Sequence, residues 1–118
     1  MTTFKDRYTL SKRKEESTRI VSKYPDRAPI IVERVATEKN LPQIDRNKYL
    51  VPNTISFGQF IFIIRKRIQC QPNDAIFLFI GKDHLVPISK TIAEVYEEMK
   101  DEEDGFLYCK YASESTFG

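Results

Sequence analysis

The chain has 118 residues, of which 41% are hydrophobic and 31% are charged, and its formal net charge is +2. This length accommodates one domain with a single modest core and excludes a second independent domain. The near-neutral charge argues against a dedicated polyanion-binding protein. No run approaches the roughly 18 apolar residues that span a bilayer, and residues 1–7 lack the apolar segment of a secretion signal. We therefore expect the bare polypeptide to be cytosolic or nuclear.

The first part of the chain predicts a helix followed by two strands. Residues 10–24 carry a narrow apolar stripe among charged side chains, and Pro25 ends this pattern, which is typical of a mostly polar helix lying on another part of the protein. Residues 30–35 are β-branched and partly alternating, and residues 48–51 follow after a polar segment. Together the two runs indicate an antiparallel hairpin.

The second part predicts two helices and two strands. Residues 57–68 place apolar side chains at three- and four-residue intervals, which indicates the main core helix. Residues 75–80 are a short continuous apolar run typical of a buried strand. Thr91 to Glu94 match a capping box at the start of an amphipathic helix, and residues 105–111 read as a final strand.

This order of elements predicts an α+β fold of the β-grasp type. The hairpin leads into a helix that crosses the sheet, and the last strand is free to pair in parallel with the first. We predict one domain over residues 1–118. Residues 1–25 form an N-terminal helical extension, residues 26–111 form the β-grasp core, and residues 112–118 form a flexible C-terminal tail.

Several short blocks occur together along the chain and carry a family resemblance. They are "KYLVP" (48–52), "GQF" (58–60), "IRKRI" (64–68), "AIFLF" (75–79), "DGFLY" (104–108) and the terminal "TFG". With these blocks the chain resembles the autophagy-related protein 8 family, the ubiquitin-like modifiers that include the GABA-receptor-associated protein. The resemblance implies a ubiquitin-like fold with two additional N-terminal helices, and it implies that the protein is not an enzyme.

The resemblance implies a chemical role for the last two residues of the chain. In this family an activating enzyme adenylates the terminal glycine, a carrier enzyme receives it as a thioester, and phosphatidylethanolamine takes it as an amide. The resemblance implies that Gly118 is that substrate and that Phe117 is an apolar handle recognised during conjugation or processing. A cysteine protease for processing or deconjugation is a further implied partner. A Phe-Gly end that arose by chance is the alternative.

Residues 48–52 predict a docking strand if they form the edge of the sheet. Unpaired backbone groups of an edge strand can accept an extended peptide as an additional strand. Strand alternation directs Lys48 and Leu50 to one face, and Tyr49 and Val51 to the other. Two hydrophobic anchors three positions apart in an added peptide also project to opposite faces, so each anchor could use its own pocket.

The resemblance supplies the residues of these pockets. It implies that cargo receptors with aromatic-x-x-aliphatic motifs dock here, and that the chain acts in the cytoplasm and, once lipidated, on the autophagosome membrane. The first pocket maps onto Glu16, Ile20, Pro29, Ile31, Lys48, Leu50 and Phe106. The second pocket maps onto Tyr49, Val51, Pro52, Ile55, Phe60 and Ile63. For Ile31 or Phe60 alone, an ordinary core position is the favoured alternative.

Basic residues leave a second function class open. Lys48, Arg65 and Arg67 could attract acidic residues that flank a docked peptide, and a solvated basic helix face is the alternative explanation for the two arginines. The clusters 12–14 and 65–67 also fit a cytosolic basic-patch module that binds microtubules or nucleic acid without conjugation. We expect no nucleic-acid partner, because no recognised nucleic-acid motif accompanies these clusters. No cofactor or metal is expected either, since ligand clusters and phosphate loops are absent from the sequence.

Three segments depart from the family pattern. Residues 81–90 are longer than the sequence that usually precedes the last helix, and the loop near residues 37–40 and the acidic turn at Glu102 and Glu103 are slightly lengthened. We expect these changes to lie away from the conjugating tail and from the docking strand, where they would affect partner preference more than the core activity.

Overall fold

The structure is a computed structural model that describes residues 2–113. Its elements are, in chain order, α1 (Phe4–Arg7), α2 (Leu10–Lys23), β1 (Arg27–Arg34), β2 (Lys48–Pro52), α3 (Phe57–Ile68), β3 (Phe77–Ile80), α4 (Ile92–Met99) and β4 (Leu107–Ala112). The predicted elements are all present. The principal differences are that the first strand begins at residue 27 and the third at residue 77, and that α1 was implied only by the family resemblance.

Side-chain caps fix the starts of the two core helices. Ser56 and Gln59 form a capping box at α3, and Thr91 and Glu94 form the predicted box at α4. In the second box the Glu94 amide donates to Thr91 Oγ1 (3.2 Å) and the Thr91 amide donates to Glu94 Oε1 (3.0 Å). These bonds satisfy amides that have no partner within the helix, so both helices begin at defined residues.

In the described residues the strands form one mixed sheet in the order β2-β1-β4-β3. The hairpin partner β2 runs antiparallel to β1, and β4 returns parallel to β1 in the centre of the sheet. The remaining strand β3 pairs antiparallel with β4 at the opposite edge. This is the predicted β-grasp topology, and it places β2 at an edge.

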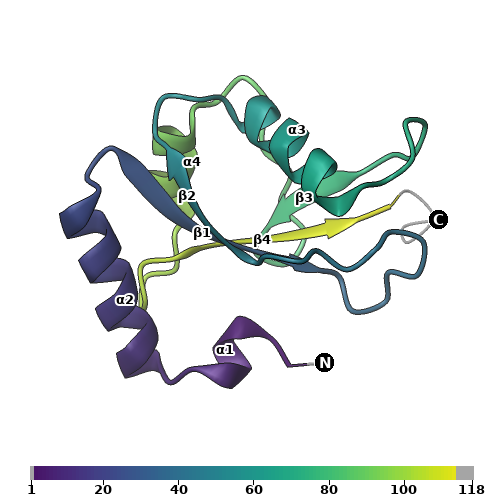
Figure 1. Cartoon of the computed structure of the whole chain (residues 1–118). Coiled ribbons are helices and arrows are strands. Elements are labelled where there is room, and N and C mark those ends of the chain that lie inside the picture. The colour runs from purple at the N-terminus through teal and green to yellow at the C-terminus, as the bar shows by residue number, and fades with distance from the viewer. Residues whose placement is uncertain (1, 114–118) are drawn as a thin grey trace.

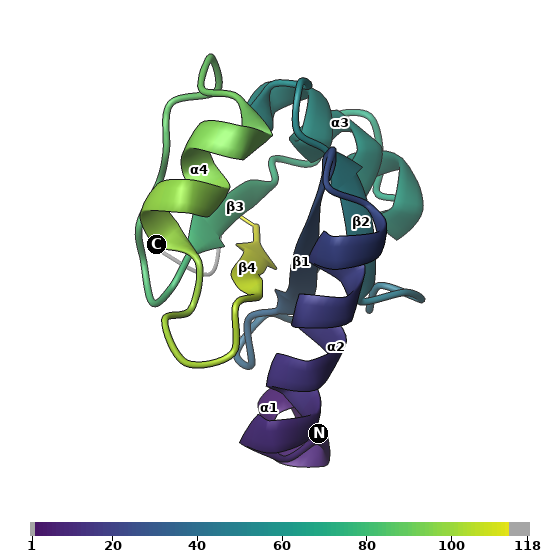
Figure 2. The same ribbon diagram turned by 90° about the vertical axis from the view of Figure 1, so that its left-hand side faces the viewer.

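The helices cover opposite faces of the sheet. Figures 1 and 2 show α3 and α4 on one side of the strands and α1 and α2 on the other. Successive side chains of β1 point to opposite faces of the sheet. Ile30 and Val32 pack in the cluster under α3 and α4, and we call this cluster the main core. Ile31 points the other way. It packs with Phe4 of α1 and Ile20 of α2 in a second cluster, which we call the minor core.

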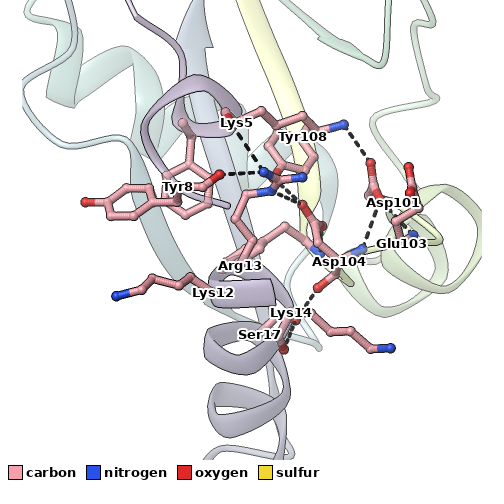
Figure 3. Close-up of polar contacts among 12 residues, drawn as sticks. Lys5, Tyr8, Lys12, Arg13, Lys14, Ser17, Asp101, Glu103, Asp104 and Tyr108 are labelled. Carbon is pink, nitrogen blue, oxygen red and sulfur yellow. Dashed lines mark hydrogen bonds and ion pairs between the residues drawn. The ribbon is translucent and has the colours of Figure 1, made fainter. Parts of the chain in front are cut away.

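A buried carboxylate joins the N-terminal helices to the turn before β4. Asp104, which is 1% exposed, accepts hydrogen bonds from Arg13 Nε (2.8 Å), the Tyr108 hydroxyl (2.6 Å) and the Phe106 amide (2.9 Å). The Ser17 hydroxyl donates to the carbonyl oxygen of Asp104 (Figure 3). Burial and the bond to Asp104 raise the pKa of Tyr108, so its hydroxyl stays protonated and keeps donating.

The guanidinium of Arg13 also fixes the connection between α1 and α2. Its Nη1 atom donates to the carbonyl oxygens of Tyr8 (2.6 Å) and Lys5 (3.3 Å). The ammonium of Lys5 in turn pairs with Asp101 at 2.7 Å (Figure 3). The N-terminal helices are therefore held against the β-grasp by polar contacts as well as by the minor core.

Arg13→Ala is expected to lower the free energy of unfolding by about 3 kcal/mol, because it leaves the charge of Asp104 buried without its cation. The side chains of this pair are 12% and 0% exposed. Lys12→Ala is the matched control, since Lys12 lies in the same helical turn and points away from the network in Figure 3. Denaturant titration measures both variants. Equal small losses would show that the network does not stabilise the fold.

The boundary of the predicted flexible tail needs a correction. Ala112 is the last residue of β4 and is fully buried. Ser113 is 8% exposed, and its amide donates to Oε1 of the buried Glu38 at 2.6 Å. Both residues therefore pack with the domain, because pairing of β4 continues to Ala112 and Glu38 supplies an acceptor beyond it. The rest of the predicted tail, residues 114–118, lies outside the described residues.

Candidate functional site

Hydrogen bonds at the two ends of the β1–β2 pair establish which backbone groups of β2 face its partner. The Val32 amide donates to the Asn47 carbonyl (2.7 Å), and the Asn53 amide donates to the Asp26 carbonyl (2.9 Å). In an antiparallel pair every second residue pair exchanges hydrogen bonds. Tyr49 lies two residues after Asn47 and four before Asn53, so it belongs to a hydrogen-bonded pair, and the register pairs it with Ile30.

Lys48 and Leu50 therefore direct their backbone N–H and C=O groups away from β1 and toward the open edge. The residue opposite Leu50 is Pro29, and this pair is one of those that exchange no backbone hydrogen bonds. The outward Leu50 carbonyl accepts a hydrogen bond from Nη1 of the exposed Arg27 at 3.1 Å. An extended peptide can pair with the outward groups of both residues, either beside Arg27 or by displacing it.

The predicted first pocket coincides with the minor core. Ile20, Ile31 and Phe106 are buried there, and Leu50 packs against them from the edge strand. Lys48 of β2 and Glu16 of α2 form an ion pair that links these two elements. Ile31 is fully buried, so in the unliganded protein it acts as a core residue. A peptide side chain entering here must separate α2 from β2 or displace the ion pair.

The predicted second pocket lies on the opposite face of β2. The ring of Tyr49 packs edge-on against Phe60 of α3 with centroids 6.1 Å apart, and both contact the main core. Phe60 is fully buried and Val51 is 4% exposed, so they form a floor. Ile63 is 41% exposed and lies off the buried stripe of α3, so its side chain is accessible beside this floor. The predicted alternation of Leu50 and Tyr49 is confirmed.

The basic residues of interest are largely engaged within the protein. Arg65 donates through Nη2 to the carbonyl oxygens of Gln71 (3.0 Å) and Pro72 (2.8 Å), which closes the loop after α3. Arg67 pairs with Asp45 at 3.2 Å. Together with the Arg13–Asp104 bond, these contacts occupy one arginine of the first basic cluster and both arginines of the second. They reduce the support for a polyanion-binding patch.

The predicted conjugation residues Gly118 and Phe117 lie outside the described residues. Within residues 2–113, no group of three His, Cys, Asp or Glu side chains is placed to hold a metal ion. Both cysteines are free thiols, Cys109 is buried, and burial raises its pKa. In the same described range, no helix is long and apolar enough to cross a membrane.

Two contacts overturn the expectation that the family departures lie away from the functional regions, for two of the three segments. Glu38, in the lengthened loop, accepts from the Ser113 amide where β4 ends. Ile88, in the longer segment 81–90, lines a cavity with Ile55 and Ile63 of the second pocket. Folding brings these segments to the base of the tail and to the docking face, so both departures border the regions of interest.

Sequence reasoning from the residues also missed Phe4. Its ring lies 5.2 Å from that of Phe106, and only 2% of the residue is exposed. The available signal was a capping box, since Thr3 and Asp6 flank Phe4 and form one in the structure. A helix of four residues gives no periodic pattern from which its buried side could have been read.

Comparisons with known proteins agree with this architecture over the full chain. The family profile described as "Autophagy protein Atg8 ubiquitin like" matches residues 12–118. Autophagy-related protein 8d of Arabidopsis thaliana is 50% identical over 118 residues, covering 100% of this chain and 96% of its own length. Autophagy-related protein 8 of Schizosaccharomyces pombe is 50% identical over 115 residues, which cover 98% and 93% of the two chains.

A solved structure extends the likeness to three dimensions. The crystal structure of Trypanosoma brucei ATG8 matches with a TM-score of 0.88 and 38% identity, covering 100% of this chain and 99% of the other. The sequence blocks, the β-grasp with two N-terminal helices and these matches lead to one assignment. The chain belongs to the Atg8 family of ubiquitin-like autophagy proteins.

Proposed function

We propose that this protein is a modifier conjugated through Gly118 to phosphatidylethanolamine on autophagosomal membranes, where it recruits cargo receptors and autophagy factors. The proposal of peptide docking is supported by the open edge of β2, whose outward backbone groups lie between two apolar clusters. The proposal of conjugation is supported by family membership. The protein itself is the substrate of the pathway, and the enzymes are its partners.

The proposed conjugation transfers one acyl group in four steps. The Gly118 carboxylate attacks ATP in the activating enzyme, giving an acyl-adenylate and pyrophosphate. Enzyme cysteine thiolates then receive the acyl group, first with release of AMP and next by exchange to the carrier enzyme. The amine of phosphatidylethanolamine displaces the carrier thiol and loses a proton, which leaves an amide. Where residues follow Gly118, a cysteine protease would first expose its carboxylate, and the same class of enzyme would reverse the conjugation.

Lipid attachment explains how a protein with no spanning helix among its described residues works on a membrane. Each buried methylene contributes about 0.8 kcal/mol, and a single acyl chain holds a protein only marginally. Phosphatidylethanolamine carries two chains, so the conjugate is stably anchored. The protein would therefore be cytoplasmic before conjugation and bound to the autophagosome membrane afterwards.

Docking would add a peptide strand to β2. Its backbone would pair with Lys48 and Leu50, while an aromatic side chain enters the minor core and an aliphatic one enters the pocket beside Tyr49. Such a peptide gains main-chain hydrogen bonds from the edge and specificity from the pockets. Binding by apolar anchors weakens little with salt, whereas binding of a polyanion falls steeply as salt rises. A salt titration therefore separates this proposal from the basic-patch alternative.

Reconstitution tests the conjugation. The protein is incubated with activating and carrier enzymes of the family, ATP and liposomes containing phosphatidylethanolamine. Mass spectrometry is expected to find the lipid adduct on Gly118, and omission of ATP is expected to abolish it. An unmodified protein in a reaction that conjugates an Atg8 relative would reject the proposal.

A further inference from the structure

One buried carboxylate holds the end of β4 to the loop between β1 and β2. Glu38 is 2% exposed, and its Oε1 atom accepts hydrogen bonds from the amide (2.6 Å) and from the hydroxyl (2.9 Å) of Ser113. The same hydroxyl lies 3.0 Å from Oε2 of Glu38. In Figure 1 this loop lies beside the end of β4. We call these contacts the tail clamp, because Ser113 directly precedes residues 114–118.

Strand pairing ends before the clamp. The register of β4 with β3 ends at Ala112, opposite Phe77, and its register with β1 ends one residue earlier, at Tyr111. Ser113 is therefore the first residue after β4, and a side chain of the loop fixes its amide where the sheet no longer does. The clamp decides where the domain stops holding the chain.

The loop holds the Glu38 carboxylate from its other side. The amides of Asn40 (2.8 Å) and Leu41 (2.9 Å) donate to Glu38 Oε2. Leu41 is buried in the main core, and the hydroxyl of Tyr111 donates to the carbonyl oxygen of Pro42 at 2.7 Å. Hydrogen bonds to an ionised acceptor are stronger than those between neutral groups, so the carboxylate has a defined position. The clamp is thus supported by the core of the domain.

The clamp limits how far Gly118 can travel while the domain stays folded. Five residues, 114–118, follow Ser113, and an extended chain spans about 3.4 Å per residue, so Gly118 reaches at most about 17 Å beyond the clamp. The two donors of Ser113 on one carboxylate also set the direction in which the backbone leaves the sheet. An enzyme that binds the domain therefore receives a short tail whose origin and direction are already set.

We propose that Glu38 is a positioning residue for the conjugation of Gly118, because it fixes the point and direction from which the tail enters the activating enzyme. The inference rests on the proposed conjugation. Without the clamp, Ser113 must be ordered at each encounter, and ordering one backbone residue lowers the population of the productive geometry by about tenfold. Prior orientation of a reacting group removes such a cost from the reaction. Glu38 acts through Ser113, five residues before the reacting carboxylate.

One round of thioester formation on an activating enzyme of the family tests the inference. The rate is measured with ATP and increasing concentrations of the parent protein, Glu38→Ala, Ser113→Ala and the combined variant. Lys39→Ala is the matched control in the same loop, since Lys39 is exposed. Arg13→Ala is the control for lost stability, because it breaks the buried pair with Asp104 and leaves the clamp intact. Circular dichroism verifies that each variant is folded.

Glu38→Ala is expected to lower the maximal rate about tenfold without changing the half-saturating concentration, because the domain still docks but delivers its tail less often. Ser113→Ala should lower the maximal rate about threefold, since its amide still donates to Glu38. Lys39→Ala should keep the rate of the parent. Partial unfolding has a different signature, because it dilutes the folded substrate and raises only the half-saturating concentration. Arg13→Ala is expected to show at most this second pattern.

The combined variant tests whether Glu38 and Ser113 act as a unit. It should be no slower than Glu38→Ala alone, because the bond of the hydroxyl to the carboxylate is already lost in that variant. Losses that multiply would show that the two residues act separately. Ser113→Ala leaves the loop and its carboxylate in place, so a parent-like rate of this variant would overturn the inference even if Glu38→Ala does not fold.

Failure of this inference is distinguishable from failure of the proposed conjugation. Absence of a thioester with the parent protein, in a reaction that accepts an Atg8 relative, would reject the conjugation itself. Normal reaction of the parent with an equal maximal rate of Glu38→Ala would reject only the positioning role. A faster reaction of Glu38→Ala would show that the clamp restrains the tail, and a change confined to the half-saturating concentration would assign Glu38 to stability alone.

Discussion

Gly118→Ala is expected to slow conjugation to phosphatidylethanolamine by about a hundredfold or more while leaving the fold unchanged. A Cβ atom next to the reacting carboxylate must enter an enzyme channel that accommodates glycine, and a displacement of about 1 Å at a reacting centre costs on the order of a hundredfold in rate. The domain should not respond, because β4 ends at Ala112 and Ser113 is anchored by Glu38. Mass spectrometry of the liposome reaction measures the rate.

Ser115→Ala is the matched control for this variant, since it makes a small change three residues before Gly118 at a position to which no role in conjugation is assigned. Its conjugation rate should equal that of the parent. Phe117→Ala is expected to fall between the two, because it removes the apolar handle but retains the reacting glycine. If Gly118→Ala is conjugated at the rate of the parent protein, Gly118 is not the residue that is conjugated.

The fold could be predicted where the signal is local. The apolar spacing of α3 and the Thr91–Glu94 box identified both core helices, because helix period and capping depend on neighbours along the chain. The parallel pairing of β4 with β1 followed from the order of the elements. Contacts between distant residues were not predictable in this way. The bond from Ser113 to Glu38 joins segments 75 residues apart, so the packing of residues 112 and 113 with the domain was not predicted.

In the docking site, too, only the features that depend on local sequence could be predicted. Alternation predicted the opposite faces of Tyr49 and Leu50 from the strand alone. The edge position of β2 required the order of the sheet, and the outward direction of the Leu50 backbone groups required the register with β1. Ile88 sits beside Gly58 only because residues 30 positions apart meet in the fold. The contact of Phe4 with Phe106 also joins residues far apart in the sequence, so it was not predicted, although Phe106 itself was assigned to the first pocket.

Combined Tyr49→Ala and Leu50→Ala is expected to weaken binding of an aromatic-x-x-aliphatic peptide by a hundredfold or more and to leave conjugation largely intact. Each substitution damages the pocket on one face of β2, while the backbone edge keeps its donors and acceptors. Burial of one large apolar anchor is worth about 1.5 to 3 kcal/mol, so loss of both exceeds a factor of about one hundred. Calorimetric titration measures the affinity, and circular dichroism verifies that the variant is folded.

The two single substitutions make the assignment of the pockets testable. Leu50→Ala should lower the affinity for a peptide with an intact aromatic anchor but have little further effect once that anchor is alanine, and Tyr49→Ala should show the same dependence on the aliphatic anchor. Coupling of this kind, measured in a double-mutant cycle, identifies residues that contact each other. Coupling of Leu50 with the aliphatic anchor and of Tyr49 with the aromatic anchor would indicate that the peptide runs along β2 in the opposite direction. Unchanged affinity in the folded double variant would place the peptide site elsewhere on the protein.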